Sequence, residues 1–218
     1  KTMARREYIP AQAILAELEE YFRRPDALPD YVTLAGSGEP TLNSGLGQII
    51  ARLKDMTMAP VAVLTNGALL ADPQVRGELS LAEVILPSLD AVTPELFQAI
   101  NRPVPGLTVD QLLEGLLALR QEFTGQIWLE VLLLRGLNDS DDELAKLKEA
   151  IMRLRPDRIH LNTAVRPVVE EYARPLSPAE LQRAADFLGA GAEVIASFGS
   201  SEHPKFELSD ADFLATLA

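Results

Sequence analysis

The sequence predicts an α/β protein built on a parallel sheet. Short apolar segments typical of strands alternate with amphipathic segments typical of helices along the 218 residues. Strands separated by helices form right-handed crossover units. Five or six such units fit an open or partial α/β barrel, or a doubly wound sheet. With 47% hydrophobic and 24% charged residues, the chain can form one core, so we expect a single domain.

The helices are predicted from apolar residues at helical spacing and from capping signals. Thr108 with Gln111, and Ser177 with Glu180, have the pattern of a capping box. In a capping box the side chain of each of the two residues accepts a hydrogen bond from the backbone N–H of the other. The predicted helices cover or begin at residues 10–24, 46–53, Asp72, Thr93, Thr108, Ser140, Ser177 and Ser209.

The strands are predicted from short apolar runs between turn residues. The longest run, residues 127–134, is interrupted by Glu130. Its carboxylate either points outward or needs a partner inside a barrel. The first predicted helix, residues 10–24, has no strand before it, so we expect one strand and one loop to be missing in front. The predicted strands are residues 31–34, 61–64, 84–86, 127–134, 158–161 and 193–197.

The composition excludes several classes of function. The net charge of −12 disfavours broad contact with nucleic acid or anionic lipid. The sequence has no cysteine and only two histidines, His160 and His203, so we assign no metal ligand within it. No apolar run approaches the length of about 20 residues that spans a bilayer. We therefore expect a cytoplasmic protein with no membrane partner.

Polar residues and turn formers follow five successive predicted strands. Parallel α/β sheets bind ligands at the carboxyl ends of their strands, so five such loops on one edge predict a ligand pocket. Taken singly, each loop could be only a turn or a helix cap. The segments are Gly36-Ser37-Gly38-Glu39-Pro40, Thr65-Asn66-Gly67, Ser88 with Asp90, Arg135-Gly136-Leu137-Asn138-Asp139, and Asn162 with Arg166.

Together these segments resemble the radical S-adenosylmethionine (radical SAM) superfamily. Residues 36–40 resemble its Gly-Gly-Glu-Pro motif with serine for one glycine, and residues 64–67 its Thr-Asn-Gly strand end. Residues 87–91 resemble its Ser-Leu-Asp-Ala segment. Residues 129–139 and 160–167 are similar to a narrower group of iron–sulfur oxidoreductases related to the enzymes that make the wyosine base of transfer RNA.

This resemblance implies a partial (β/α)6 TIM-like barrel of radical SAM type that spans residues 1–218 and lacks its first strand and cluster loop. It also implies that the loop at 36–40 binds the methionine amino group, that the next two loops contact the ribose and carboxylate, and that the strand ending at Asn162 lies near the adenine. The implied cofactor-binding residues are Gly36, Ser37, Gly38, Glu39, Pro40, Thr65, Asn66, Ser88, Asp90, Leu161 and Asn162.

The family holds a 4Fe-4S cluster with three closely spaced cysteines, and this sequence contains none. We expect those ligands upstream of Lys1, and we expect residues to be missing after Ala218, where a predicted helix breaks off. The resemblance implies reductive cleavage of S-adenosylmethionine to a 5′-deoxyadenosyl radical that takes hydrogen from a substrate. The fragment alone, lacking the cluster cysteines, would be inactive.

Two other hypotheses stay open. One is a cluster-free relative that binds S-adenosylmethionine. The other is a conventional α/β-barrel enzyme with Glu130 or His160 as a general acid or base. The substrate is a transfer RNA, a peptide or a small molecule, and the expected electron donor is a flavodoxin or ferredoxin. The candidates for substrate contact are Glu130, Arg135 and Arg166.

Overall fold

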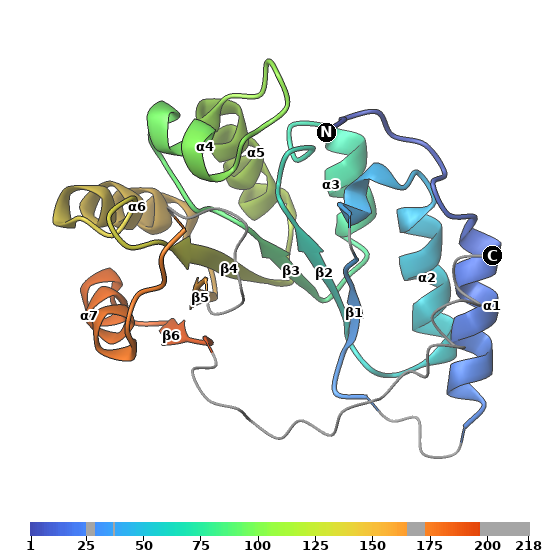
Figure 1. Cartoon of the computed structure of the whole chain (residues 1–218). Helices are drawn as coiled ribbons and strands as arrows, with labels where there is room; N and C mark the ends of the chain where they lie inside the picture. The colour runs from blue at the N-terminus through green and yellow to red at the C-terminus, as the bar shows by residue number, and fades with distance from the viewer. Residues whose placement is uncertain (25–28, 37, 165–172, 197–218) are drawn as a thin grey trace, which may run out of the picture.

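The described residues form one six-stranded parallel sheet (Figure 1). The computed structural model describes residues 1–24, 29–36, 38–164 and 173–196. The spatial order of the strands follows the chain, from the first strand to the last, and every pair is parallel. The strands are β1 (Val32–Leu34), β2 (Val61–Thr65), β3 (Val84–Pro87), β4 (Gln126–Leu133), β5 (Arg158–Thr163) and β6 (Ala192–Val194).

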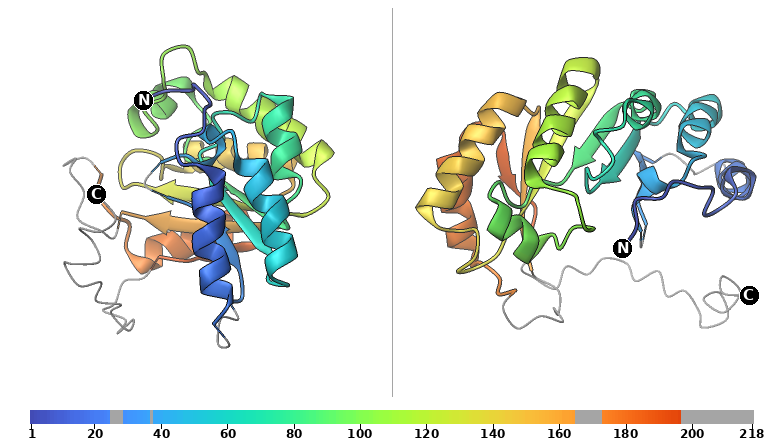
Figure 2. Two further views of the ribbon diagram at one scale, coloured as in Figure 1. Left: turned by 90° about the vertical axis from the view of Figure 1, so that its right-hand side faces the viewer. Right: turned by 90° about the horizontal axis from the view of Figure 1, so that it is seen from above.

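The helices lie along the outer side of the curved sheet, so the described residues have the shape of a partial barrel (Figure 2). Right-handed crossovers between neighbouring strands place successive helices on the same face. A doubly wound sheet reverses its strand order, so that alternative is wrong here. The helices are α1 (Ala11–Phe22), the 3-10 turn η1 (Pro40–Leu42), α2 (Leu46–Met56), α3 (Pro73–Leu79), α4 (Pro94–Ile100), α5 (Val109–Glu122), α6 (Asp141–Leu154) and α7 (Pro178–Leu188).

The predicted capping signals begin the helices as expected. Both capping boxes form, at Thr108 for α5 and at Ser177 for α7. Asp72 caps α3 by accepting a 2.8 Å hydrogen bond from the Gln74 N–H. Ser140 does the same for α6, accepting at 3.3 Å from the Glu143 N–H. The helix predicted from Ser209 lies outside the described residues.

Two strands, β5 and β6, end two or more residues away from their predicted ends. β5 continues past Leu161 to Thr163, because β4 extends far enough to pair with it there. β6 begins one residue earlier than predicted and ends at Val194, three residues before the predicted end at Ser197. Ser197 itself lies outside the described residues.

Alternation along β4 separates the core from the inner face of the sheet. Four residues of β4 are fully buried and pack against the helices: Ile127, Leu129, Val131 and Leu133. The residues between them, Trp128, Glu130 and Leu132, are only half-buried. Because successive strand side chains point to opposite faces, these three lie on the inner face. Glu130 therefore does not enter the core between sheet and helices.

Charged and aromatic side chains meet at the end of the inner face where the strands begin. The Trp128 ring lies edge-on to Tyr31, with centroids 5.5 Å apart, and 5.4 Å from the His160 ring. The Arg158 guanidinium lies 4.7 Å over the same indole. Glu193 is 3.1 Å from His160 Nε2 and 3.5 Å from an Arg158 nitrogen. This end of the inner face is occupied by contacts within the protein.

Leu129→Ala should lower the free energy of unfolding by about 2–5 kcal/mol, because it leaves a cavity in the centre of the core. The control is Met58→Ala: Met58 is 98% exposed, and its loss should change the stability by less than about 0.5 kcal/mol. Urea unfolding of both variants measures the difference. Equal losses would show that β4 is not buried as described.

Candidate functional site at the carboxyl ends of the strands

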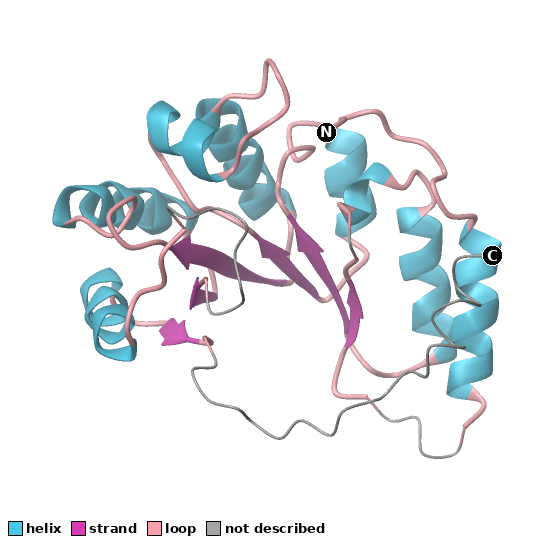
Figure 3. Ribbon diagram, in the orientation of Figure 1, coloured by secondary structure: helices cyan, strands magenta, loops and turns pink. Residues whose placement is uncertain are grey.

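The predicted site residues lie at one edge of the sheet because all strands run in the same direction. Figure 3 shows the arrowheads of β2, β3 and β4 pointing to this edge. Short hydrogen bonds join the chain after β1, β2, β3 and β4. Among the described residues, the side chain of Asn162, near the end of β5, bonds only to the next residue of its own strand. Ser37 and Arg166 lie outside the described residues, and nothing is assigned to them here.

The Glu39 carboxylate joins the loop after β1 to the end of β2. One oxygen accepts hydrogen bonds from the Thr41 N–H at 3.1 Å, the Thr41 hydroxyl at 2.6 Å and the Thr65 hydroxyl at 2.7 Å. The other accepts from the Asn66 N–H at 2.7 Å. An ionised carboxylate has about four acceptor sites, so these four bonds use its ordinary capacity. Glu39 thus fixes the position of two loops.

Asn66 and Gly67 form a tight turn after β2. The Asn66 side-chain oxygen accepts a 2.9 Å hydrogen bond from the Ala68 N–H, and this exposed residue lines the cavity described below. Gly67 has φ +75°, and a Cβ built there would lie 2.6 Å from the Leu112 side chain. Both the backbone conformation and the close approach of α5 therefore require glycine.

Ser88 connects β2, β3 and β4 at this edge. Its N–H donates a 3.0 Å hydrogen bond to the Thr65 carbonyl, and it pairs with Glu130 in an isolated parallel bridge. The next residue, Leu89, donates its N–H to the Glu130 carbonyl at 2.9 Å. The Ser88 hydroxyl makes no hydrogen bond to any described residue, so it is available to a ligand.

Asp90, predicted to contact the cofactor, also holds its own neighbours in place. Its carboxylate accepts from the Leu132 N–H at 2.9 Å and from the Asn101 side-chain amide at 2.8 Å. Burial raises the pKa of Asp90, and these two hydrogen bonds oppose the rise. Asn101 Oδ1 is buried with no hydrogen-bond partner among the described residues.

Asn138, which lies in one of the predicted pocket loops but was not among the implied cofactor-binding residues, ties the loop after β4 to the loop after β3. Its amide donates to the carbonyls of Asp90 at 2.7 Å and Leu132 at 2.8 Å, and its oxygen accepts from the Leu134 N–H at 2.8 Å. The side chain is buried and fully bonded. The signal in the sequence was an asparagine within the turn that follows a buried strand.

Glu130 presents its carboxyl group on the inner face, beside Ser88 and close to Asp90. Burial, and then the negative charge of Asp90, raise the pKa of Glu130. No described residue donates a hydrogen bond to this carboxyl or forms an ion pair with it. The predicted partner inside the barrel is therefore not supplied by the described part of the chain.

The two residues predicted near the adenine lie on opposite faces of β5. Asn162 is half-buried on the inner face, and its side-chain oxygen accepts from the Thr163 N–H at 2.8 Å. Leu161 is fully buried in the core beside the helices. The Leu161 side chain therefore does not join the inner face, because alternation along the strand turns it away.

Arg135 reaches across to α7 and does not point into the strand-end site. Its guanidinium lies 2.5 Å from the Glu180 carboxylate and donates at 3.2 Å to the Pro175 carbonyl. Hydrogen bonds from Ser177 lower the pKa of Glu180, and the positive charge of Arg135 lowers it further. His160, an alternative general base, contacts Glu193 and Trp128 and is the register partner of Glu130.

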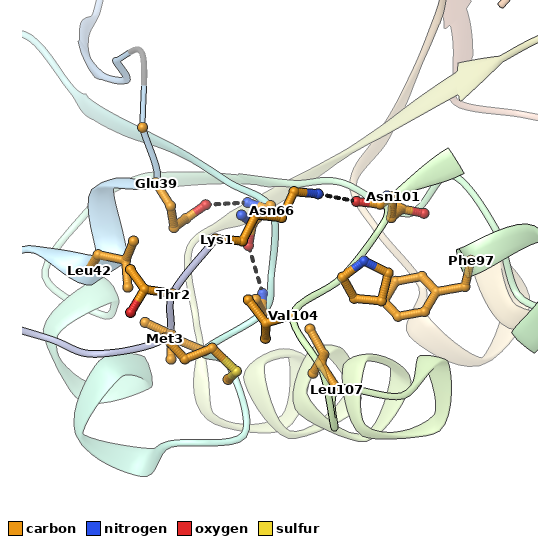
Figure 4. A pocket seen from close by; sticks show the side chains of 14 residues that line it. Lys1, Thr2, Met3, Glu39, Leu42, Asn66, Phe97, Asn101, Val104 and Leu107 are labelled. Atoms are coloured by element: carbon orange, nitrogen blue, oxygen red, sulfur yellow. Dashed lines mark hydrogen bonds between the residues drawn. The ribbon is translucent and has the colours of Figure 1, made fainter. Parts of the chain in front are cut away.

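A cavity of about 440 Å³ lies beside the Glu39–Asn66 bond (Figure 4). In this view Glu39 and Asn66 lie above Val104 and Leu107, and Phe97 lies to the right. The segment that begins the chain also lines it: the Lys1 ammonium donates to the carbonyls of Asn101 and Arg102. Mixed polar and apolar walls of this size are typical of small-molecule sites.

The donor set at this edge fits a nucleotide that carries positive charge. The open glycine-containing loop offers backbone groups, the Ser88 hydroxyl is unbonded, and the Glu130 carboxyl lacks a cation. The same residues do not fit an iron–sulfur cluster, because the sequence contains no cysteine. The described residues also contain no group of three or more histidine and carboxylate side chains placed to hold a metal ion.

Residues 3–147 match the Radical SAM superfamily, and the chain belongs to this family. Similar proteins include one named GTPase Obg from Brachyspira hyodysenteriae, 36% identical over 187 residues, covering 86% of this chain and 27% of that protein. A UPF0026 protein from Synechocystis is 35% identical over 211 residues, covering 97% of this chain and 73% of its own length. The chain therefore spans about a quarter of the first relative and most of the second.

Solved structures of radical SAM proteins share the fold. The crystal structure of a radical SAM methyltransferase from Sphaerobacter thermophilus superposes with a TM-score of 0.67 at 20% identity, covering 88% of this chain and 59% of that one. The predicted α/β fold with a partial barrel is thus confirmed. No helix among the described residues has the length and apolar character that a membrane span requires.

Glu39→Gln should lower the free energy of unfolding by about 1–3 kcal/mol. Glutamine has one amide nitrogen in place of a carboxylate oxygen, so either the Asn66 N–H or the Thr65 hydroxyl loses its acceptor. Hydrogen exchange of the Asn66 amide should speed up more than exchange within α6. An unchanged stability and exchange rate would contradict the role of Glu39 in joining the loops.

Glu130→Gln should raise the thermal unfolding midpoint at pH 7. A raised pKa means that the folded protein binds the Glu130 proton more tightly than the unfolded chain does, so stability falls as pH rises above the ordinary value of 4.5. Glutamine removes this penalty. The advantage of the variant should shrink as the pH falls toward 4.5, and a lower midpoint at pH 7 would contradict the assignment.

Proposed function

We propose that this protein binds S-adenosylmethionine at the carboxyl ends of β1 to β5 and uses it in radical chemistry on a substrate held at the inner face. The observation that carries the proposal is the bonded series from Glu39 through Thr65 to Ser88, which joins three predicted cofactor loops into one rigid edge. Membership of the radical SAM superfamily supports the same class of enzyme.

The residues of this chain would bind and orient the nucleotide. The backbone of Gly36 and Gly38 would receive the methionine ammonium, while Glu39 holds that loop in place. Ser88 and Asn66 would contact the ribose and carboxylate, and Asn162 would lie beside the adenine. Pro40 begins the 3-10 turn that follows Glu39. Proline has no backbone N–H to donate to a ligand, so Pro40 contributes to the shape of the loop.

When bound and reduced by one electron, S-adenosylmethionine supplies a 5′-deoxyadenosyl radical that removes hydrogen from a substrate. In this family a 4Fe-4S cluster would supply that electron, and this sequence, which contains no cysteine, offers no thiolate ligand for it. The electron donor would be a flavodoxin or ferredoxin. The role of this chain is to position the nucleotide and exclude water from the inner face.

For the substrate, we propose only its chemical class. The motifs at residues 129–139 and 160–167 support a relation to the wyosine-base enzymes, and with it a transfer RNA substrate. The charge of −12 weighs against a large phosphate-binding surface within these residues. A peptide or a small molecule fits the charge more readily. A cytoplasmic location agrees with an oxygen-sensitive reaction.

Ser88→Ala should weaken S-adenosylmethionine binding about tenfold and leave the thermal midpoint unchanged, because its hydroxyl makes no bond to a described residue. The control is Ser80→Ala, which removes an exposed hydroxyl just before β3 begins. Calorimetry measures binding. The protein from its complete gene, prepared without oxygen and reduced with dithionite, should form 5′-deoxyadenosine.

Failure to bind S-adenosylmethionine would overturn the proposal. Binding without 5′-deoxyadenosine would support the cluster-free alternative. Activity that persists in air, without S-adenosylmethionine and with iron chelators present, would instead support a conventional barrel enzyme that uses Glu130 or His160 in acid–base chemistry.

A further inference from the structure

Charged and titratable side chains are rare in the six strands, and not all of them form ion pairs. The strands contain four such side chains: Glu130, Arg158, His160 and Glu193. Arg158 and His160, the basic ones, both contact Glu193. His160 is also the register partner of Glu130 on the neighbouring strand. Glu130, one position further along the inner face than Trp128, forms no ion pair with a described residue.

The surroundings of Glu130 make its negative charge costly unless a positive charge lies close to the carboxyl group. The Glu130 carboxyl is half-buried between Trp128 and Leu132 on its own strand, and the nearby Asp90 carboxylate adds negative charge. Asp90 itself receives only neutral donors, the Leu132 N–H and the Asn101 amide. A partly buried carboxylate without a cation is costly, and buried charges in proteins are usually paired.

The position of Glu130 places that requirement at the proposed nucleotide site. Glu130 pairs directly with Ser88, and its carbonyl accepts the Leu89 N–H at 2.9 Å. A nucleotide held by the Ser88 hydroxyl would therefore lie against the Glu130 side chain. S-adenosylmethionine carries a sulfonium charge, whereas S-adenosylhomocysteine has a neutral thioether and is otherwise the same apart from one methyl group.

We propose that Glu130 recognises the positive sulfonium of the bound nucleotide and so sets a preference for S-adenosylmethionine over S-adenosylhomocysteine. This inference rests on the proposed function, because it concerns the same site. It gives the inner face a role of its own, because the Glu130 side chain on β4 favours the positively charged S-adenosylmethionine. The loops at the strand ends hold the groups that S-adenosylmethionine and S-adenosylhomocysteine share.

The test compares the two nucleotides on three proteins by calorimetry: the wild type, Glu130→Gln and Glu149→Gln. Glu149 is an exposed residue of α6, so its variant removes the same charge far from the inner face. Trp128, the only tryptophan of the chain, lies on the inner face two residues from Glu130, and its fluorescence gives a second binding signal.

In the wild type and in Glu149→Gln, S-adenosylmethionine should bind about tenfold more tightly than S-adenosylhomocysteine. In Glu130→Gln that preference should disappear through a loss of S-adenosylmethionine affinity alone. Glu130→Asp, which keeps the charge on a shorter side chain, should retain part of it. A raised thermal midpoint of Glu130→Gln would show that the variant is folded.

Three results would overturn the inference. Equal losses for both nucleotides would mean that Glu130 contacts a group that they share. An unchanged preference in Glu130→Gln would leave the carboxyl to a cationic substrate. No preference in the wild type would remove the basis of the proposal. If the wild type binds neither nucleotide, the proposed function itself fails, so the two failures are distinguishable.

Discussion

The structure depends on one constraint: six parallel strands in sequential order end at the same edge. Every loop that follows a strand must then fit beside its neighbours, and side-chain and backbone hydrogen bonds make the connections. Glu39 joins β1 to β2, Ser88 joins β2 to β4, and Asn138 joins the loops after β3 and β4. These bonds convert separate turns into a continuous rim.

The same constraint gives the sheet two unlike faces. The outer face is closed by helices and is mostly apolar, so it provides the hydrophobic stabilisation. The inner face has a small apolar cluster of Ala62, Val84 and Leu86 with Leu64 and Trp128 against it, and it carries the charged side chains of the strands. Arg158 and His160 pair with Glu193, whereas Glu130, the register partner of His160, forms no ion pair with a described residue.

Much of the fold could be predicted from the sequence because its signals are local. Capping boxes at Thr108 and Ser177 and the apolar run of β4 depend on residues close in the chain, and all three formed as predicted. The boundaries of β5 and β6 were less accurate because they depend on pairing with a neighbouring strand. The choice between a barrel and a doubly wound sheet needed the family resemblance or the strand order.

The site was predicted as a set of residues, but their contacts were not. Glu39, Thr65 and Ser88 meet because parallel strands bring their ends together, which the pattern alone indicates. The sequence does not show that the Glu39 carboxylate accepts four hydrogen bonds from within the protein. It also does not show that the Leu161 side chain points into the core. Both follow from the orientation of a side chain relative to residues far away in the chain.

By itself, the sequence determined the alternation of strands and helices, the absence of thiolate ligands and the polar residues at each strand end. Local propensity and composition are sufficient for these features. Only the tertiary structure decided which carboxylate is internally satisfied and which lacks a partner. Glu39 and Glu130 are the same residue type beside parallel strands, but only packing sets the number of donors that reach each one.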